Sequence, residues 1–360
     1  MLAWRAHIDP DTRFWTHPGP FKLECGAVLP HVQVAYRTWG RLAEGCVNAV
    51  LVCHALTGSA DADRWWAGLI GPGRALDVER DYIVCSNVLG SCYGTTGPLS
   101  PRAKGRDPWG PDFPPITIRD MVRLQAVLLE HLGVRRLRLV VGGSMGGMQA
   151  LEWALLYPER VEAVAAIAVS GRHSAWCIAI SEAQRQAIYA DPRWQGGRYY
   201  PGPGPEVGLS AARMMAMCLY RSPESFALRF GRNLQPEADC FAVESYLRYQ
   251  GRKLVHRFDA NSYVLLTRAM DSHDLARSRG PYEAVLRSIA HPTLVVSIPT
   301  DRLYVPEEQR ELARLIPNAR LVELDSPHGH DAFLIETERL GALLARFRAE
   351  LGHWACRRTG

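Results

Sequence analysis

The feature that most restricts the fold is a serine set between two glycines at the end of an apolar run. Residues 137–141 read Leu-Arg-Leu-Val-Val, and residues 142–147 read Gly-Gly-Ser-Met-Gly-Gly. In this G-x-S-x-G order the serine occupies a strained turn between a strand and a helix, and side chains in place of the glycines would collide with both. The turn lifts the hydroxyl clear of the sheet, so we predict that Ser144 is a covalent nucleophile. The alternative is a glycine-rich turn without chemistry.

Strand-like and helix-like segments alternate on both sides of a long helical stretch. Strand-like runs occupy residues 32–37, 49–54, 82–86, 137–141, 164–169, 293–297 and 320–323, and helical spacing occupies residues 118–132, 149–157, 306–315 and 332–347. The stretch between them has helix-like segments at residues 181–189, 209–220, 223–230, 242–250 and 262–270. This order predicts an α/β core, a mostly parallel sheet with helices on both faces, formed by residues 1–170 and 289–360. Residues 171–288 are predicted to be an inserted helical lid.

A serine turn inside such a sheet is similar to the nucleophile turn of the α/β-hydrolase fold, where the acid and then the histidine follow the serine in the chain. Serine needs that base, held in place by a third group. Asp301 comes soon after one late strand-like run and His330 comes after the last one, so they are the predicted acid and base. His328 stays open as an alternative base. Asp271 and Asp274, in the helical stretch, stay open as alternative acids.

The segment at residues 54–58, His-Ala-Leu-Thr-Gly, follows an early strand-like run. Loops at this place in the fold supply one backbone amide for the tetrahedral oxyanion, and the residue after the nucleophile supplies the other. The predicted donors are therefore the amides of Leu56 and Met145, unless the segment is an ordinary strand–loop junction. His54 precedes the serine, which is the wrong order for the base.

Composition indicates an ordinary globular protein and excludes several functions. The net charge is only +5 and the basic residues are scattered, with short pairs at residues 135–136 and 357–358, so nucleic-acid binding is not expected. The nine cysteines form no CxxC pair and no zinc-type spacing, so we expect no metal site and reduced thiols. No signal peptide and no apolar run of membrane length are evident. We expect a cytoplasmic protein.

Several long motifs, which follow one another along the chain, indicate a narrower group of proteins than the fold alone does. They are residues 54–58 (HALTG), 65–73 (WWAGLIGPG), 87–98 (NVLGSCYGTTGP), 142–147 (GGSMGG), 244–247 (ESYL), 257–263 (RFDANSY) and 329–334 (GHDAFL). Together they closely resemble the homoserine O-acetyltransferases, a family that also includes homoserine and serine O-succinyltransferases. The resemblance runs from about residue 21 to residue 344.

The resemblance implies a two-step acyl transfer without a cofactor. Ser144 would attack the thioester of the co-substrate acetyl-CoA with His330 as the base and Asp301 orienting the imidazole. The hydroxyl of L-homoserine would then take the acetyl group, giving O-acetyl-L-homoserine for methionine biosynthesis. In the family an arginine at the position of Arg213 holds the substrate carboxylate, and an aspartate at that of Asp331 holds its ammonium. The resemblance also suggests a homodimer joined through the lid.

The position two residues after the acid bears on the choice of acyl group. Relatives that use succinyl-CoA tend to carry an arginine there, and this chain has Leu303, which favours acetyl. Arg302 is adjacent but is expected to point elsewhere. The loop at residues 59–64, Ser-Ala-Asp-Ala-Asp-Arg, departs from the family pattern and could change acceptor or acyl preference. A succinyltransferase of the same family, a plain serine esterase and a binding protein without chemistry are the alternatives.

Overall fold

The computed structural model describes residues 7–102, 107–236 and 239–357, with only the backbone described at residue 46 and residues 352–357. The first six residues, the cysteines at positions 46 and 356 and the basic pair at residues 357–358, all considered above, therefore fall outside the described side chains. Within the described ranges, no helix combines the length and apolar character needed to cross a membrane.

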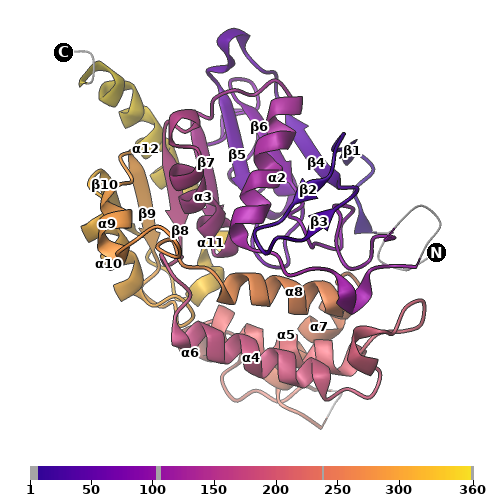
Figure 1. Cartoon of the computed structure of the whole chain (residues 1–360). Coiled ribbons are helices and arrows are strands. Elements are labelled where there is room, and N and C mark those ends of the chain that lie inside the picture. The colour runs from indigo at the N-terminus through magenta and orange to yellow at the C-terminus, as the bar shows by residue number, and fades with distance from the viewer. Residues whose placement is uncertain (1–6, 103–106, 237–238, 358–360) are drawn as a thin grey trace.

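An eight-stranded sheet forms the centre of the molecule (Figure 1). In spatial order its strands are β1 (Arg13–Thr16), β4 (Gln33–Trp39), β6 (Tyr82–Ser86), β5 (Ala49–Cys53), β7 (Leu139–Gly143), β8 (Val164–Ile167), β9 (Thr293–Ser297) and β10 (Ala319–Glu323). The strands from β6 to β10 are parallel, and β1 and β4 join antiparallel at one edge. The prediction of a mostly parallel α/β sheet is confirmed.

Alternate side chains of each buried strand enter two separate apolar cores. On β5, Leu51 and Cys53 join the core beneath α2 (Ile118–His131) and α3 (Met145–Leu156), while Val50 and Val52 join the core on the other face. The second core is covered by α1 (Ala62–Trp65), α11 (Ala332–Ile335) and α12 (Thr337–Arg357). β5 and β7 are fully buried on both faces, and they are paired up to their carboxyl ends, where Cys53 lies opposite Gly142.

Between β8 and β9 the chain forms helices that lie beyond one end of the sheet (Figure 1). This part of the chain is called the helical insertion below. Its helices are α4 (Ala175–Tyr189), α5 (Glu206–Tyr220), α6 (Pro223–Phe230), α7 (Ala242–Val255) and α8 (Ala260–Asp271). A further helix, α9 (Tyr282–Arg287), packs against α10 (Pro306–Leu315) beside the sheet. At the start of α6 the Ser222 side chain accepts from the amide of Ser225, and Pro223 occupies the first turn, so the helix begins where its sequence favours a start.

Several local features differ from the sequence prediction, and some of them have a clear cause. The edge strand β1, and the small sheet of β2 (Phe21–Lys22) and β3 (Val28–Leu29), were not predicted, because their exposed residues carry no continuous apolar pattern. Helix α3 begins at Met145 rather than near residue 149, since glycines at its start weaken the helical signal. The predicted helix at residues 332–347 is two helices, interrupted at Glu336.

Candidate active site

Ser144 lies on a strained turn between β7 and α3. Its φ is 57° and its ψ is −127°, a conformation that non-glycine residues rarely adopt. The amide of Ser144 is fixed by a 2.9 Å hydrogen bond to the Ile167 carbonyl. A Cβ at position 142 would lie 2.4 Å from the backbone of Gly146, and one at position 146 only 2.1 Å from the Cys53 carbonyl oxygen. The collisions expected from the sequence are therefore present, and both glycines are required for the turn to close.

The predicted acid and base are brought together from two different loops. Nδ1 of His330 lies 2.6 Å from Oδ2 of Asp301, and both side chains are buried. The other carboxylate oxygen of Asp301 accepts the amides of Leu303, at 2.8 Å, and Tyr304, at 3.1 Å. Each oxygen of the acid thus has a partner, and because Nδ1 of His330 is the nitrogen bonded to Asp301, Nε2 is the ring nitrogen left to act as the base.

Aromatic rings enclose His330 next to the serine turn. The rings of Tyr220 and Tyr304 lie 5.8 and 5.4 Å from its ring centroid, and Phe333 meets it edge-on at 5.5 Å. Phe333 also packs so closely on Gly143, the neighbour of Ser144, that a Cβ there would lie 2.7 Å from its ring. The same ring therefore touches the serine turn and the histidine.

The charge of Asp301 controls the titration of His330. Burial by itself lowers the pKa of His330, but the nearby carboxylate of Asp301 and the hydrogen bond to it outweigh burial, so the pKa is raised above its ordinary value. A base with a raised pKa takes a proton from serine more readily once it is neutral.

The alternative acids and base have other partners. Nδ1 of His328 lies 3.1 Å from the hydroxyl of Ser225 on α6, so this histidine contacts the helical insertion. Asp271 pairs with Arg185 at 2.7 Å, and Asp274 accepts a backbone amide of its own turn at 2.8 Å. Among the three carboxylates considered, the structure brings only Asp301 to His330.

The segments that carry Leu56 and Met145 are tied together by Gln149, a fully buried residue of α3. Its side-chain amide donates to the carbonyl oxygens of His54, at 3.2 Å, and Met145, at 3.1 Å. Within the described part of the chain, neither the Leu56 amide nor the Met145 amide is engaged in a hydrogen bond. Both amides are therefore available to an oxyanion. The sequence prediction missed Gln149, since a glutamine on a helix carries no signal of this bridge.

His54 fixes the peptide that bears the Leu56 amide. Nε2 of His54 accepts the Val88 amide at 3.1 Å, so the ring proton is on Nδ1, which donates to the Ala55 carbonyl oxygen at 2.8 Å. Burial lowers the pKa of His54 to about 4, which keeps the ring neutral near pH 7. His54 therefore has a positioning role instead of that of the base, as its place in the sequence indicates.

Arg213 and Asp331 lie in one charged group with a residue that the sequence did not single out. The guanidinium of Arg213 lies over the Tyr220 ring at 5.3 Å, and Nε of Arg221 lies 3.3 Å from a carboxylate oxygen of Asp331. Burial raises the pKa of Asp331, and the charges of Arg213 and Arg221 partly offset this effect. The group presents two cations and one anion beside His330.

Leu303 and Arg302 diverge as neighbouring side chains should. Leu303 is 7% exposed, joins the apolar core and accepts the Cys177 thiol on its carbonyl, whereas Arg302 is exposed. The position predicted to read the acyl group is therefore apolar and packed.

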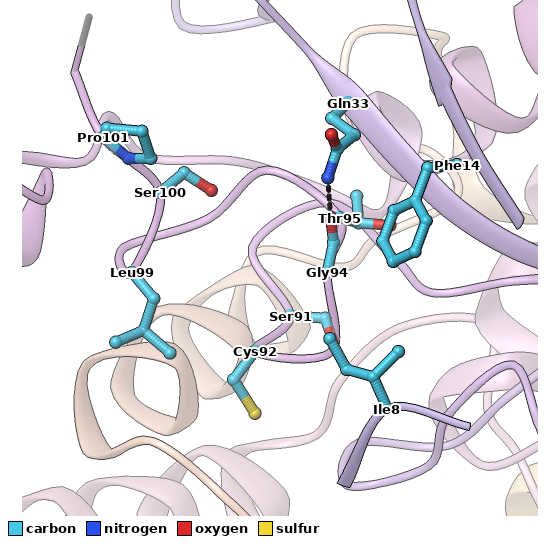
Figure 2. Close-up of a pocket in the computed structure, with 10 residues that line it drawn as sticks. All are labelled: Ile8, Phe14, Gln33, Ser91, Cys92, Gly94, Thr95, Leu99, Ser100 and Pro101. Atoms are coloured by element: carbon cyan, nitrogen blue, oxygen red, sulfur yellow. Dashed lines mark hydrogen bonds between the residues drawn. The ribbon is translucent and has the colours of Figure 1, made fainter. Parts of the chain in front are cut away.

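A cavity of about 450 Å³ lies beside the loop that follows β6 (Figure 2). Polar residues such as Gln33, Ser91 and Thr95 line it together with Ile8 and Phe14, and Gln33 donates to the Gly94 carbonyl at 3.0 Å. None of the three predicted catalytic residues lines this cavity. In the described residues, no group of three or more histidine, cysteine or acidic side chains is arranged to hold a metal ion.

The chain is similar to several known proteins in sequence and in structure. A family model described as the alpha/beta hydrolase fold matches residues 48–337. A homoserine O-acetyltransferase of Trichormus variabilis is 60% identical over 350 residues, which cover 97% of each chain. The crystal structure of a homoserine O-acetyltransferase from Bacillus anthracis has a TM-score of 0.86 and 26% identity, covering 94% of this chain and 98% of that one. An acetylester hydrolase from Corynebacterium glutamicum has a TM-score of 0.87 and 25% identity, covering 97% and 100%.

Proposed function

The chain belongs to the homoserine O-acetyltransferase family of the alpha/beta hydrolase fold, and on that premise we propose that it moves an acetyl group from acetyl-CoA to the hydroxyl of L-homoserine through an acyl-enzyme on Ser144. The observation that carries the proposal is the buried pair of His330 and Asp301, joined at 2.6 Å beside the serine turn. That pair supplies the base that serine needs.

In the first half-reaction Oγ of Ser144 attacks the thioester carbonyl while its proton moves to Nε2 of His330. The amides of Leu56 and Met145 stabilise the tetrahedral oxyanion, and each such donor contributes about 3–4 kcal/mol in well-studied hydrolases. The intermediate collapses, the thiolate of CoA takes the proton from His330, and the acetyl group remains on Ser144. Asp301 stabilises the imidazolium that forms between these steps.

In the second half-reaction the homoserine hydroxyl gives its proton to His330 and attacks the acetyl ester. Arg213 is proposed to bind the substrate carboxylate and Asp331 the ammonium, since a zwitterion needs one fixed cation and one fixed anion. Arg221 already pairs with Asp331, so it would share that carboxylate with the substrate. Collapse of the second intermediate releases O-acetyl-L-homoserine and restores Ser144.

The residue at position 303 supports the proposed preference for acetyl over succinyl. Leu303 offers no charge to a succinyl carboxylate, and its side chain is packed in the core. No cofactor beyond the co-substrate is needed for this chemistry. By analogy with the family, the product would enter methionine biosynthesis in the cytoplasm.

A homodimer through the helical insertion is also proposed. Large apolar side chains on its outer surface remain exposed, among them Val207 and Leu228, each 75% exposed, and Leu234, 66% exposed. These side chains are the proposed contacts with a second copy of the chain, and the proposal itself rests on the family resemblance.

A hydrolase that transfers the acyl group to water is the second candidate, because the acetylester hydrolase of Corynebacterium glutamicum has the same fold. The test is a matrix of acetyl-CoA or succinyl-CoA against L-homoserine, L-serine or no acceptor, with CoA release followed by a thiol reagent and Ser144→Ala as the control. The proposal predicts fastest release with acetyl-CoA and L-homoserine. CoA release that is equally fast without any acceptor would contradict it and indicate the hydrolase.

A further inference from the structure

The turn at residues 55–58 carries the proposed oxyanion amide of Leu56. Gly58 donates its amide to the Ala55 carbonyl at 2.9 Å, and His54 donates to the same oxygen. The Ala55 carbonyl and the Leu56 amide belong to one planar trans peptide, so they point in opposite directions. Whatever fixes the carbonyl therefore also aims the Leu56 N–H. His54 and Gly58 do this from the side of the sheet.

Arg257, a residue of the helical insertion, holds the other end of this turn. It lies between α7 and α8, 200 residues further along the chain, and its Nη1 donates to the Thr57 carbonyl at 2.7 Å and to the Tyr93 hydroxyl at 2.6 Å. Nη2 lies 3.4 Å from the Thr57 hydroxyl. The neighbouring Phe258 packs edge-on against the Tyr93 ring at 5.8 Å. The insertion thus grips both Thr57 and Tyr93.

The charge of Arg257 is not used in an ion pair. The side chain is half-buried, and in the described ranges no carboxylate lies within 4 Å of it, whereas Arg221 and Arg185 of the same insertion each pair with an aspartate. Partial burial of a cation among neutral acceptors costs free energy unless those hydrogen bonds are made. Its contacts fall instead on the turn and on Tyr93.

We propose that Arg257 is a positioning residue for acyl transfer, which fixes the turn at residues 55–58 so that the Leu56 amide points at the developing oxyanion. The inference rests on the proposed function, since it takes Ser144 as the nucleophile and Leu56 as an oxyanion donor. An oxyanion forms in both half-reactions, so loss of Arg257 slows both by the same factor. Removing one donor outright costs about 10²–10³-fold in rate, and a misdirected donor is expected to cost about 10–100-fold.

A different role for the same cation predicts different kinetics. If Arg257 bound the carboxylate of homoserine or a phosphate of CoA, its loss would raise a KM and spare a substrate without either group. The acetyl ester p-nitrophenyl acetate has neither group, and its burst of p-nitrophenol reports only acylation of Ser144 and the oxyanion donors.

The experiment compares the burst rate, and kcat and KM for L-homoserine, in wild type and Arg257→Gln. The matched control is Arg268→Gln, an exposed arginine of α8 that donates to Tyr189. We expect a burst about 10–100-fold slower for Arg257→Gln, with an equal fall in kcat and an unchanged KM, and a wild-type rate for Arg268→Gln. An unchanged burst, or an effect confined to KM, would overturn the inference.

A second variant keeps the inference testable if Arg257→Gln does not fold. Tyr93→Phe keeps the ring packing against Phe258 but removes one acceptor of the Arg257 guanidinium. It should slow the burst less than Arg257→Gln, and the two effects should not add in the double variant. Tyr93→Phe at the wild-type burst rate would count against the inference. The wild-type assays distinguish the two proposals. If the wild-type enzyme gives a burst but does not acetylate homoserine, the proposed function is wrong, while the role of Arg257 can still be tested by the burst.

Discussion

Replacing Asp301 with asparagine tests how the acid orients the base. One oxygen of Asp301 accepts two backbone amides and the other faces Nδ1 of His330. An asparagine side chain has a single oxygen, so that oxygen can accept from the backbone amides or face His330, but it cannot do both. With the NH₂ group toward the backbone, the amides of Leu303 and Tyr304 would lose their acceptor inside the core. An unmade buried hydrogen bond costs about 1–3 kcal/mol, so this orientation is disfavoured by at least about 2 kcal/mol.

The favoured orientation therefore places the NH₂ group against His330. The asparagine then donates to Nδ1, which forces the ring proton onto Nε2, the nitrogen that must accept the serine proton. The equivalent change in a serine protease lowers kcat by about 10⁴-fold through the same wrong tautomer. We expect a loss of about 10³–10⁴-fold in the acylation burst for Asp301→Asn, with little change in the free energy of unfolding.

Asp301→Ala is the contrasting variant. It removes the acceptor of both backbone amides, so the free energy of unfolding should fall by about 2–6 kcal/mol in addition to the loss of activity. The assay is the p-nitrophenyl acetate burst together with urea unfolding of each variant. An Asp301→Asn burst within tenfold of wild type, or an Asp301→Ala protein as stable as Asp301→Asn, would show that Asp301 does not orient His330 in this way.

Three further predictions follow from the same contacts. Gly146→Ala places a Cβ 2.1 Å from the Cys53 carbonyl and should lower the free energy of unfolding by about 3 kcal/mol and abolish the burst, whereas Gly19→Ala, with open space around it, should behave as wild type; equal stability of the two variants would contradict this. Leu303→Arg should raise the ratio of succinyl-CoA to acetyl-CoA rates at least about fivefold, the equivalent of about 1 kcal/mol from a new ion pair, and an unchanged ratio would disprove it. The pKa of His54 in the folded protein is lowered to about 4, so between about pH 6.5 and 4 only the unfolded chain binds a proton at this residue. The free energy of unfolding should therefore fall progressively, by about 3 kcal/mol, as the pH falls from about 6.5 to about 4. Urea unfolding of wild type and His54→Gln should show a shallower pH dependence in the variant; identical slopes would rule this out.

The positions of the acid and base were predictable because the fold fixes their order. Residues that end parallel strands meet at one edge of the sheet, so Asp301 after β9 and His330 after β10 had to approach the serine turn after β7. The glycines at positions 142 and 146 revealed the turn for a similar reason, since only a missing side chain allows the close approach seen there. The order of the catalytic residues along the chain and the close packing around the two glycines therefore made the acid, the base and the serine turn predictable.

Other parts of the site depend on contacts between distant segments. Arg221 contacts Asp331 and Arg257 contacts Thr57, although the two residues of each pair are more than a hundred positions apart in the sequence. Nothing local distinguishes these arginines from the many others in the chain. The motif at residues 257–263 was visible in the sequence, but its role requires the helical insertion to be placed against the sheet. The edge strand β1 was missed because its pairing with β4, rather than its own pattern, determines it.

Ser144 is proposed to carry the acyl group between the two half-reactions, and intact-mass analysis can detect that acyl-enzyme. The protein is mixed with acetyl-CoA alone, quenched in acid and weighed, and L-homoserine is then added to a parallel sample before quenching. We expect a mass increase of one acetyl group, located on the peptide that contains Ser144, absent from Ser144→Ala and discharged by L-homoserine. An acetyl group on another residue, or one that L-homoserine does not remove, would contradict it.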